Sequence, residues 1–271
     1  MTDASSSRLR GAGRSATNPW YKLRKETVIS LGGLTLAWQI ASYFFPPYLF
    51  PPVPAIAQKF FAIFINQESL ANAGATAARI FAGLTVAFLL GAVLAFVMGR
   101  SQRSYRYVYP LLNFIQGIPA LSWVVIAIIW FEGTEPRILF IMTATTLPAF
   151  SFQILDAYSS MSKDLFEMTL SFRPSKFDLF RTLILPTIVP GMLTAWKVNL
   201  GNAARVVVVA ELVGATGGIG YQLLMQQQLF DMAGALAWTL VLVVFVLVVQ
   251  QVITRIEGWL LAYRPSTERS A

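Results

Sequence analysis

Five polar residues interrupt an apolar stretch at residues 187–213, and their types suit the handling of a charged solute. They are Lys197, Asn199, Asn202, Arg205 and Glu211. Lys197, Gly201 and Arg205 share one helical face, because residues four apart are neighbours on a helix. If the stretch crosses a membrane, each charge costs about 2.5–3.5 kcal/mol to insert and should face the protein interior or a cavity. A basic, amide-bearing face of this kind favours anions in a transport pathway.

Two interpretations of this face stay open. In the first, it lines a pathway for an anionic solute, with Gln116 and Ser122 of an earlier apolar run opposite. In the second, its two cations pair with Glu211, Glu167 or carbonyl groups and only hold helices together, as intramembrane charges often do.

A second candidate site is the charged stretch at residues 163–186, KDLFEMTLSFRPSKFDLFRTLILP, which contains seven ionisable residues. Apolar residues recur at helical spacing in each half, Leu165, Met168 and Phe172 in the first and Phe177, Phe180 and Ile184 in the second. Pro174 ends the first helix because proline lacks an amide donor. Ser175 and Asp178 have capping-box spacing at the start of the second. The sequence predicts two short amphipathic helices in water, which by themselves fit a solvated connector.

The composition shows what must position these residues. The 271 residues are 56% hydrophobic and 13% charged, with a mean hydropathy of +0.60, which predicts a polytopic membrane protein. There is no cysteine and no histidine. Without cysteine, a thiol nucleophile and a Cys-type zinc site are excluded. Without histidine, the chain lacks the side chain that most often serves as general base or metal ligand. These absences, with no paired carboxylates at catalytic spacing, disfavour a membrane enzyme.

Hydropathy predicts six membrane-spanning helices, at residues 28–45, 76–98, 111–131, 138–155, 187–213 and 233–253. The first is an uncleaved span, because no small-residue cleavage site follows it. The sequence LFPPVPAIAQKF at residues 49–60 predicts a proline-stiffened turn that leads into a short amphipathic segment. Gly83 and Gly91 of the second span allow another helix to approach closely.

The distribution of basic residues predicts the orientation. Of 21 Lys and Arg residues, six precede the first span, three lie at 100–106, four at 163–186 and three at the carboxyl end, all assigned to the cytoplasm. Lys59, Arg79, Arg137, Lys197 and Arg205 remain. The net charge of +8 thus reflects cytoplasmic loops and gives no reason to expect nucleic-acid binding. Both termini and the stretch at 163–186 are expected in the cytoplasm.

The charged stretch resembles the EAA loop of binding-protein-dependent ABC importer permeases, whose pattern is Glu-Ala-Ala, three residues, Gly, nine residues, then Ile-x-Leu-Pro. Glu167 matches the glutamate, and the closing motif falls in register at Leu183, Leu185 and Pro186. Two departures are the alanine positions, which are Met168 and Thr169, and the glycine position, which is Arg173. Arg173 suggests either a charge contact with an acidic patch on the ATPase or a turn in which Pro174 compensates for the missing glycine.

Two further segments carry the resemblance over most of residues 46–255. The sequence PGMLTAWKVNLGNAARVVVVAELVGATGGIGYQL at residues 190–223 resembles the fifth span and following loop of the subfamily that imports taurine, alkanesulfonates, nitrate and related solutes. The LFPPVPAIAQKF segment resembles the same subfamily. In the glycine-rich loop, GATGGIG indicates a hinge or turns with positive φ, because a phosphate-binding loop needs a strand before it and a helix after it.

The resemblance implies an all-α polytopic fold of six transmembrane helices with a cytoplasmic helix-turn-helix coupling loop at residues 158–186. It divides the chain into a basic cytoplasmic tail (1–27), a transmembrane permease domain (28–255) and a cytoplasmic tail (256–271). The loop is expected to dock on an ATPase through Glu167, Arg173, Pro174, Ser175, Lys176 and Pro186. ATP and Mg²⁺ are expected on that partner and no cofactor on this chain, which has no G-x-x-x-x-G-K-[ST] motif.

The resemblance also implies a homodimer in the bacterial inner membrane, surrounded by lipid. Its further partners are two cytoplasmic ATPase subunits and a periplasmic or lipid-anchored substrate-binding protein. The expected solute is a small organic or inorganic anion of the sulfonate, taurine or nitrate type, and bicarbonate and uncharged heterocycles stay open as alternatives. One alternative is a secondary transporter that moves a small anion alone, which leaves the coupling loop without a role and offers only Glu211 for proton relay. Another is a membrane-anchored scaffold, which does not explain the polar fifth span.

Overall fold

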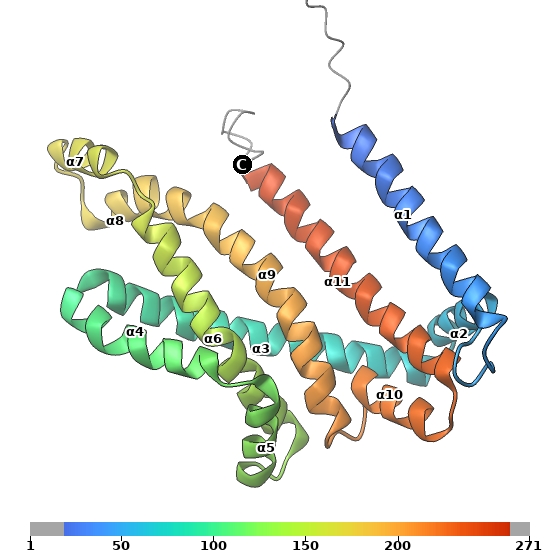
Figure 1. The fold of residues 1–271 in the computed structure, drawn as a ribbon. Coiled ribbons are helices and arrows are strands. Elements are labelled where there is room, and N and C mark those ends of the chain that lie inside the picture. The colour runs from blue at the N-terminus through green and yellow to red at the C-terminus, as the bar shows by residue number, and fades with distance from the viewer. Residues whose placement is uncertain (1–18, 261–271) are drawn as a thin grey trace, which may run out of the picture. The chain divides into compact units, whose positions relative to one another are not determined.

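The computed structural model describes residues 19–260, and side chains from residue 25 except those of Lys163 and Lys176. All regular elements among these residues are helical (Figure 1). They are α1 (Pro19–Ser42), α2 (Val53–Ile65), α3 (Gln67–Arg100), α4 (Gln102–Gly117), α5 (Ala120–Trp130), α6 (Thr134–Ser159), α7 (Lys163–Ser171), α8 (Lys176–Leu179), the π-helix η1 (Phe180–Ile184), α9 (Leu185–Leu212), α10 (Ile219–Gln228) and α11 (Met232–Leu260). The predicted tails at 1–18 and 261–271 lie outside the described residues. The chain forms two units, Met1–Pro54 and Ala55–Ala271.

The smaller unit contains α1 and a turn that folds back on its end. The Trp38 ring stacks on Phe50 with centroids 4.1 Å apart, and its indole N–H donates to the Pro51 carbonyl at 3.1 Å. Gln39 Oε1 accepts from the Val53 amide at 2.9 Å. These contacts hold the predicted proline-stiffened turn, which leads directly into α2.

Four helices in the described residues are long and apolar enough to cross a membrane, and a bent pair, α4 with α5, brings the number to five. They correspond to the last five predicted spans. The predicted first span at 28–45 is not among them; α1 covers most of it and ends at Ser42. Six spans are therefore not established by length and composition.

The predicted third span at 111–131 is not one straight helix. The axes of α4 and α5 differ by 93° across a short break. Ile118 is extended, with φ −77° and ψ 125°, because the ring of Pro119 disfavours the helical region for the residue before it. Gly117 and Pro119 were visible in the sequence, and together they end one helix and begin the next.

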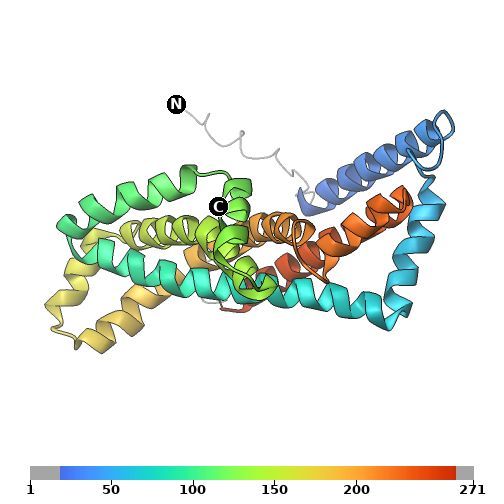
Figure 2. The ribbon, with the colours of Figure 1, turned by 90° about the horizontal axis from the view of Figure 1, so that it is seen from below.

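The larger unit is built on the close packing of α3, α6 and α9. Figure 2 shows α3, α4 and α6 running alongside one another. A Cβ atom on Gly83 would lie 2.6 Å from Cβ of Met142, and one on Gly91 would lie 3.0 Å from Cβ of Phe150. The two glycines thus let α3 and α6 approach closely, as the sequence predicted. Phe150 also contacts Trp196 of α9, with ring centroids 5.8 Å apart.

The charged stretch begins as predicted and then differs. α7 ends at Ser171, before Pro174, and α8 begins after Ser175. However, α8 has only four residues and runs through the π-helical turn η1 into α9, so that residues Phe177–Leu212 form one long apolar segment. Helices α7 and α8 lie at one end of the larger unit, and α5 and α10 lie toward the other (Figure 1).

Candidate functional site

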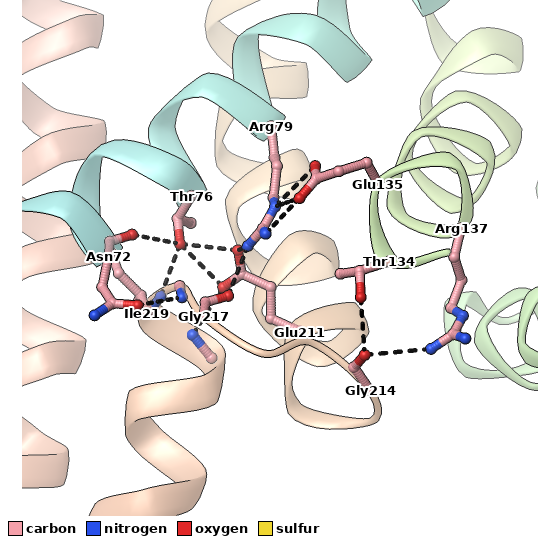
Figure 3. Close-up of polar contacts among 12 residues, drawn as sticks. Asn72, Thr76, Arg79, Thr134, Glu135, Arg137, Glu211, Gly214, Gly217 and Ile219 are labelled. Carbon is pink, nitrogen blue, oxygen red and sulfur yellow. Dashed lines mark hydrogen bonds and ion pairs between the residues drawn. The ribbon is translucent and has the colours of Figure 1, made fainter. Parts of the chain in front are cut away.

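A buried carboxylate joins α9 to α3 at the end of the unit opposite α7 and α8. Glu211 is fully buried and accepts from Arg79 Nη1 at 2.7 Å. Its two oxygens also accept from Thr76 Oγ1, at 2.9 and 3.0 Å, and Oε2 accepts from the Gly220 amide at 2.8 Å. The charge is therefore paired and fully hydrogen-bonded, as a buried carboxylate requires (Figure 3).

The same face of α3 binds the glycine-rich loop. Asn72, Thr76 and Arg79 lie four and three residues apart, so they share one side of the helix. Asn72 Oδ1 accepts from the Gly218 amide and Thr76 Oγ1 from the Ile219 amide, both at 2.7 Å. Arg79 Nη1 donates to the Gly217 carbonyl at 2.7 Å. We call Asn72, Thr76, Arg79, Glu211 and residues 217–220 the Glu211 clamp.

Two glycines of the clamp are required by geometry. Gly218 has φ 117°, and a Cβ atom there would lie 2.4 Å from Glu211 Oε1. A Cβ atom on Gly220 would lie 2.4 Å from the Val208 carbonyl oxygen. The loop is therefore a fixed turn against α9 and α3, and Gly218 meets the expectation of a positive φ.

Arg79 also joins the clamp to α6. Its Nη2 contacts Glu135 Oε1 at 2.6 Å, and the Glu135 side chain is 67% exposed. Nearby, Thr134 Oγ1 and Arg137 Nη1 donate to the Gly214 carbonyl at 3.2 and 3.4 Å. Two residues of the first turn of α6 thus hold the start of the loop that follows α9 (Figure 3).

A more exposed ion pair lies at the turn between α10 and α11. Lys59 Nζ of α2 is 2.6 Å from Asp231 Oδ2. Partial burial opposes ionisation of Asp231, but the Lys59 ammonium and the amides of Gly234 and Ala233 outweigh it and lower the pKa of the carboxyl. The pair ties α2 to the start of α11.

The predicted pathway residues do not form one cluster. Lys197 pairs with Glu257 of α11, a residue assigned by sequence to the carboxyl-terminal tail. Asn199 is buried and donates to Gln153 Oε1 of α6 at 2.8 Å and to the Ala195 carbonyl at 2.9 Å. Glu211 belongs to the clamp. Neither cation of this face therefore pairs with Glu211, and Lys197 holds α9 to α11.

The remaining pathway candidates are exposed in the single chain: Gln116, Ser122, Asn202 and Arg205. Arg205 makes no ion pair within the described part of the chain. Gln116 lines a polar cavity of about 450 Å³ with Tyr105, Tyr109, Asn113, Phe152, Leu155, Asp156 and Ser159. This cavity brings Gln116 together with α6, and none of the polar α9 candidates lines it.

The turn between α7 and α8 has a well-defined hydrogen-bonded structure. Ser175 Oγ accepts from the Asp178 amide at 3.1 Å and donates to Asp178 Oδ2 at 2.6 Å. The predicted cap is therefore confirmed, with the carboxylate bonded to the serine hydroxyl. Arg173 has φ 47°, in the left-handed region that favours glycine. Lys176 begins α8, and its side chain lies outside the described part of the chain.

Large apolar side chains of the charged stretch at residues 163–186 are exposed in the single chain. Phe172 is 80% exposed, Phe177 68% and Met168 56%, and Leu165 and Phe180 are about half exposed. Glu167 is also exposed. Pro186, the last of the predicted coupling residues, lies within the first turn of α9. A protein segment in water with this much exposed apolar surface is typical of an interaction site.

Comparison with known proteins identifies the chain. The family described as "Binding-protein-dependent transport system inner membrane component" matches residues 87–261. The chain belongs to this family. It is thus a multi-pass permease subunit of an ABC transporter, without catalytic activity of its own, and a separate ATPase subunit hydrolyses ATP. A substrate-binding protein is the other partner that the family implies.

Individual relatives support the same assignment. The taurine transport system permease protein TauC of Escherichia coli K12 is 26% identical over 212 residues, covering 74% of this chain and 77% of TauC. The formylaminopyrimidine transport permease protein ThiX of Halalkalibacterium halodurans is 27% identical over 234 residues, covering 85% of this chain and 92% of ThiX. A chain of the inward-facing MetNI methionine ABC transporter has the same fold, with a TM-score of 0.57 at 17% identity over 77% of this permease and 95% of that chain.

Sequence reasoning found Glu211 but missed Asn72, Thr76 and Glu135, and it left Arg79 without a role. A signal was present: three polar residues share one helical face at the start of an apolar helix, and one is an arginine. Within the described residues, no group of three or more His, Cys, Asp or Glu side chains could hold a metal ion.

Proposed function

We propose that two copies of this permease form the pathway of an importer for a small anionic solute of the sulfonate, taurine or nitrate class. Both termini and the coupling loop (residues 158–186) face the cytoplasm, where the loop docks on the ATPase subunit. ATP-driven closure of two ATPases moves the two loops together and changes the access of the pathway. A periplasmic or lipid-anchored binding protein delivers the solute from the other side.

The observation that carries the docking proposal is the uncovered apolar surface of the coupling loop. Leu165, Met168 and Phe172 of the first half are all at least half exposed, although seven ionisable residues make the stretch aqueous. A solvated connector gains nothing from such side chains, whereas a partner groove buries them. Glu167 adds an exposed carboxylate beside this surface, in register with the glutamate of the family pattern.

Replacing Glu167 with Ala tests the dock. The variant should leave the permease folded, because the side chain is exposed, but it should weaken co-purification with the ATPase subunit. Glu68→Ala, which removes an exposed carboxylate from the first turn of α3, is the matched control and should co-purify normally. An intact complex with unchanged solute-stimulated ATP hydrolysis in Glu167→Ala argues against the dock.

The anion proposal rests on two observations. Relatives of this chain are named as permeases for taurine and nitrate. Arg205 is an exposed cation on α9 without an ion-pair partner in the described residues, whereas the charge of Lys197 is balanced by Glu257. An unpaired guanidinium in a membrane helix should face a cavity, where it attracts anions and can bind a sulfonate or nitrate through two hydrogen bonds.

Replacing Arg205 with Gln tests the pathway role. In vesicles that contain the whole transporter, the variant should assemble normally and import an anionic solute at least about tenfold more slowly, because a charge-assisted hydrogen bond contributes about 1.5–3 kcal/mol. Arg103→Gln, at the start of α4, removes one exposed cation as a control and should transport normally. Unchanged affinity and rate for Arg205→Gln would exclude this residue from the pathway.

A further inference from the structure

The backbone at the end of α7 takes a conformation that suits glycine better than the residue present. Arg173 follows the last turn of α7 with φ 47°, and its amide donates to the Leu170 carbonyl at 2.9 Å. The left-handed conformation closes many helices, usually with glycine. Other residues are disfavoured in this conformation because Cβ approaches a carbonyl oxygen.

Within the described part of the chain, no contact of the Arg173 side chain offsets this backbone strain. The side chain is exposed, and among the described residues its guanidinium makes no hydrogen bond or ion pair. Asp178, an acid beyond the turn, is hydrogen-bonded to Ser175. Backbone strain that nothing nearby offsets is typical of a functional position.

The surroundings of Arg173 resemble the centre of a protein interface. Phe172 beside it is 80% exposed, and Phe177 beyond the turn is 68% exposed. Aromatic residues and arginine are the types most enriched where interfaces gain their energy. The capping bonds of Ser175 and Asp178 hold the turn in one shape, so the guanidinium is presented with little loss of backbone freedom on binding.

We infer that Arg173 is a specificity residue, whose guanidinium pairs with a carboxylate at the rim of the groove that receives the coupling loop on the ATPase subunit. This inference rests on the proposed docking of the loop and adds a partner chemistry to it. The planar guanidinium binds a carboxylate through two parallel hydrogen bonds, which an ammonium does not match. An ATPase without an acidic residue at this rim should bind the loop poorly.

The test uses variants for which stability and docking change in opposite directions. Arg173→Gly removes both the strain and the charge, so the permease should melt at the same or a higher temperature. Its affinity for the purified ATPase subunit of the same transporter should nevertheless fall about tenfold or more, as for loss of a charged hydrogen bond. Arg173→Lys keeps the charge and should bind between wild type and Arg173→Gly. Added salt should reduce the differences in ATPase affinity between wild type and the variants, because it screens ion pairs.

The outcomes separate this inference from the proposed dock. If wild-type permease binds the ATPase and Arg173→Gly binds it equally well at low salt, the inference is wrong and the dock stands. If Arg173→Gly is less stable and binds more weakly, Arg173→Asn decides, since asparagine tolerates the left-handed conformation without a charge. Wild-type affinity for that stable variant overturns the inference, and a tenfold loss supports it. If the wild-type permease does not bind the ATPase at all, the dock and the inference fail together.

Discussion

Replacing Glu211 with Gln should weaken the Glu211 clamp and let the glycine-rich loop open more often. The carboxylate accepts from Arg79, Thr76 and the Gly220 amide, and all of these donors remain in the variant. A carboxamide has one oxygen, and its NH₂ group must face either the guanidinium or the Gly220 amide, donor against donor. The shape of the side chain is conserved, so the effect isolates charge and hydrogen bonding.

The free-energy cost of Glu211→Gln follows from the burial of the Arg79–Glu211 ion pair. Breaking a buried ion pair costs about 3–5 kcal/mol, because the remaining charge is left without compensation. Arg79 keeps its contact with Glu135 at 2.6 Å, which places the cost near the lower end, at about 3 kcal/mol. At about 1.4 kcal/mol per factor of ten, the open form of the loop should become on the order of 100-fold more populated.

The absence of cysteine from the chain gives a direct assay. Ile219 is 2% exposed in the loop, so Ile219→Cys introduces a single protected thiol. Its rate of maleimide labelling in purified permease should rise by up to about 100-fold when Glu211→Gln is added, as the open population does.

Glu135→Gln in the same Ile219→Cys background is the matched control. It removes the exposed partner of Arg79, and exposed pairs contribute at most about 1 kcal/mol, so the rate should rise by no more than about fivefold. Equal labelling of wild type and Glu211→Gln, or an equal effect of both substitutions, would refute the assignment of Glu211 as the centre of the clamp.

Two further predictions follow from the same end of the molecule. Gly218→Ala should lower the melting temperature of the purified permease, because φ 117° is strained for alanine and Cβ would lie 2.4 Å from Glu211 Oε1. Gly74→Ala is the control and should leave the melting temperature unchanged, because Gly74 has open space around it. Equal melting temperatures of the two variants would contradict the strained turn. Asp231→Asn should remove a pH-dependent contribution of less than about 1 kcal/mol. Because the pKa of Asp231 is lowered from 3.8, the contribution is present above about pH 4 and lost as pH falls through the folded pKa. Melting curves should therefore separate wild type from Asp231→Asn at pH 6 but not at pH 2.5, and a difference that grows toward acid would show that Lys59 does not stabilise the charged form.

The sequence predicted local features of the fold well. Gly83 and Gly91 were expected at a close helix contact, and they pack on α6. Ser175 and Asp178 form the expected cap, because a cap depends only on residues three apart. Hydropathy located the four long apolar helices and the bent pair of α4 and α5, since each carries its own apolar run. The bend between α4 and α5 required knowing that Gly117 and Pro119 act together, which single-residue signals do not settle.

Long-range polar pairing was not predictable from spacing. Arg79 and Glu211 are 132 residues apart, and Lys197 and Glu257 are 60 apart. Several acids could have satisfied each cation, and only the packing of α3, α9 and α11 selects among them. The left-handed backbone at Arg173 was signalled only by the glycine that the family pattern has at this position, because arginine itself is unusual in that conformation.

The most direct test of the account is solute uptake into vesicles that contain this permease, its ATPase subunit and its binding protein. We expect import of a small anion that requires ATP and all three proteins, and that falls when Glu167 is replaced by Ala. Uptake by the permease alone, driven by an ion gradient and indifferent to Glu167→Ala, would contradict it.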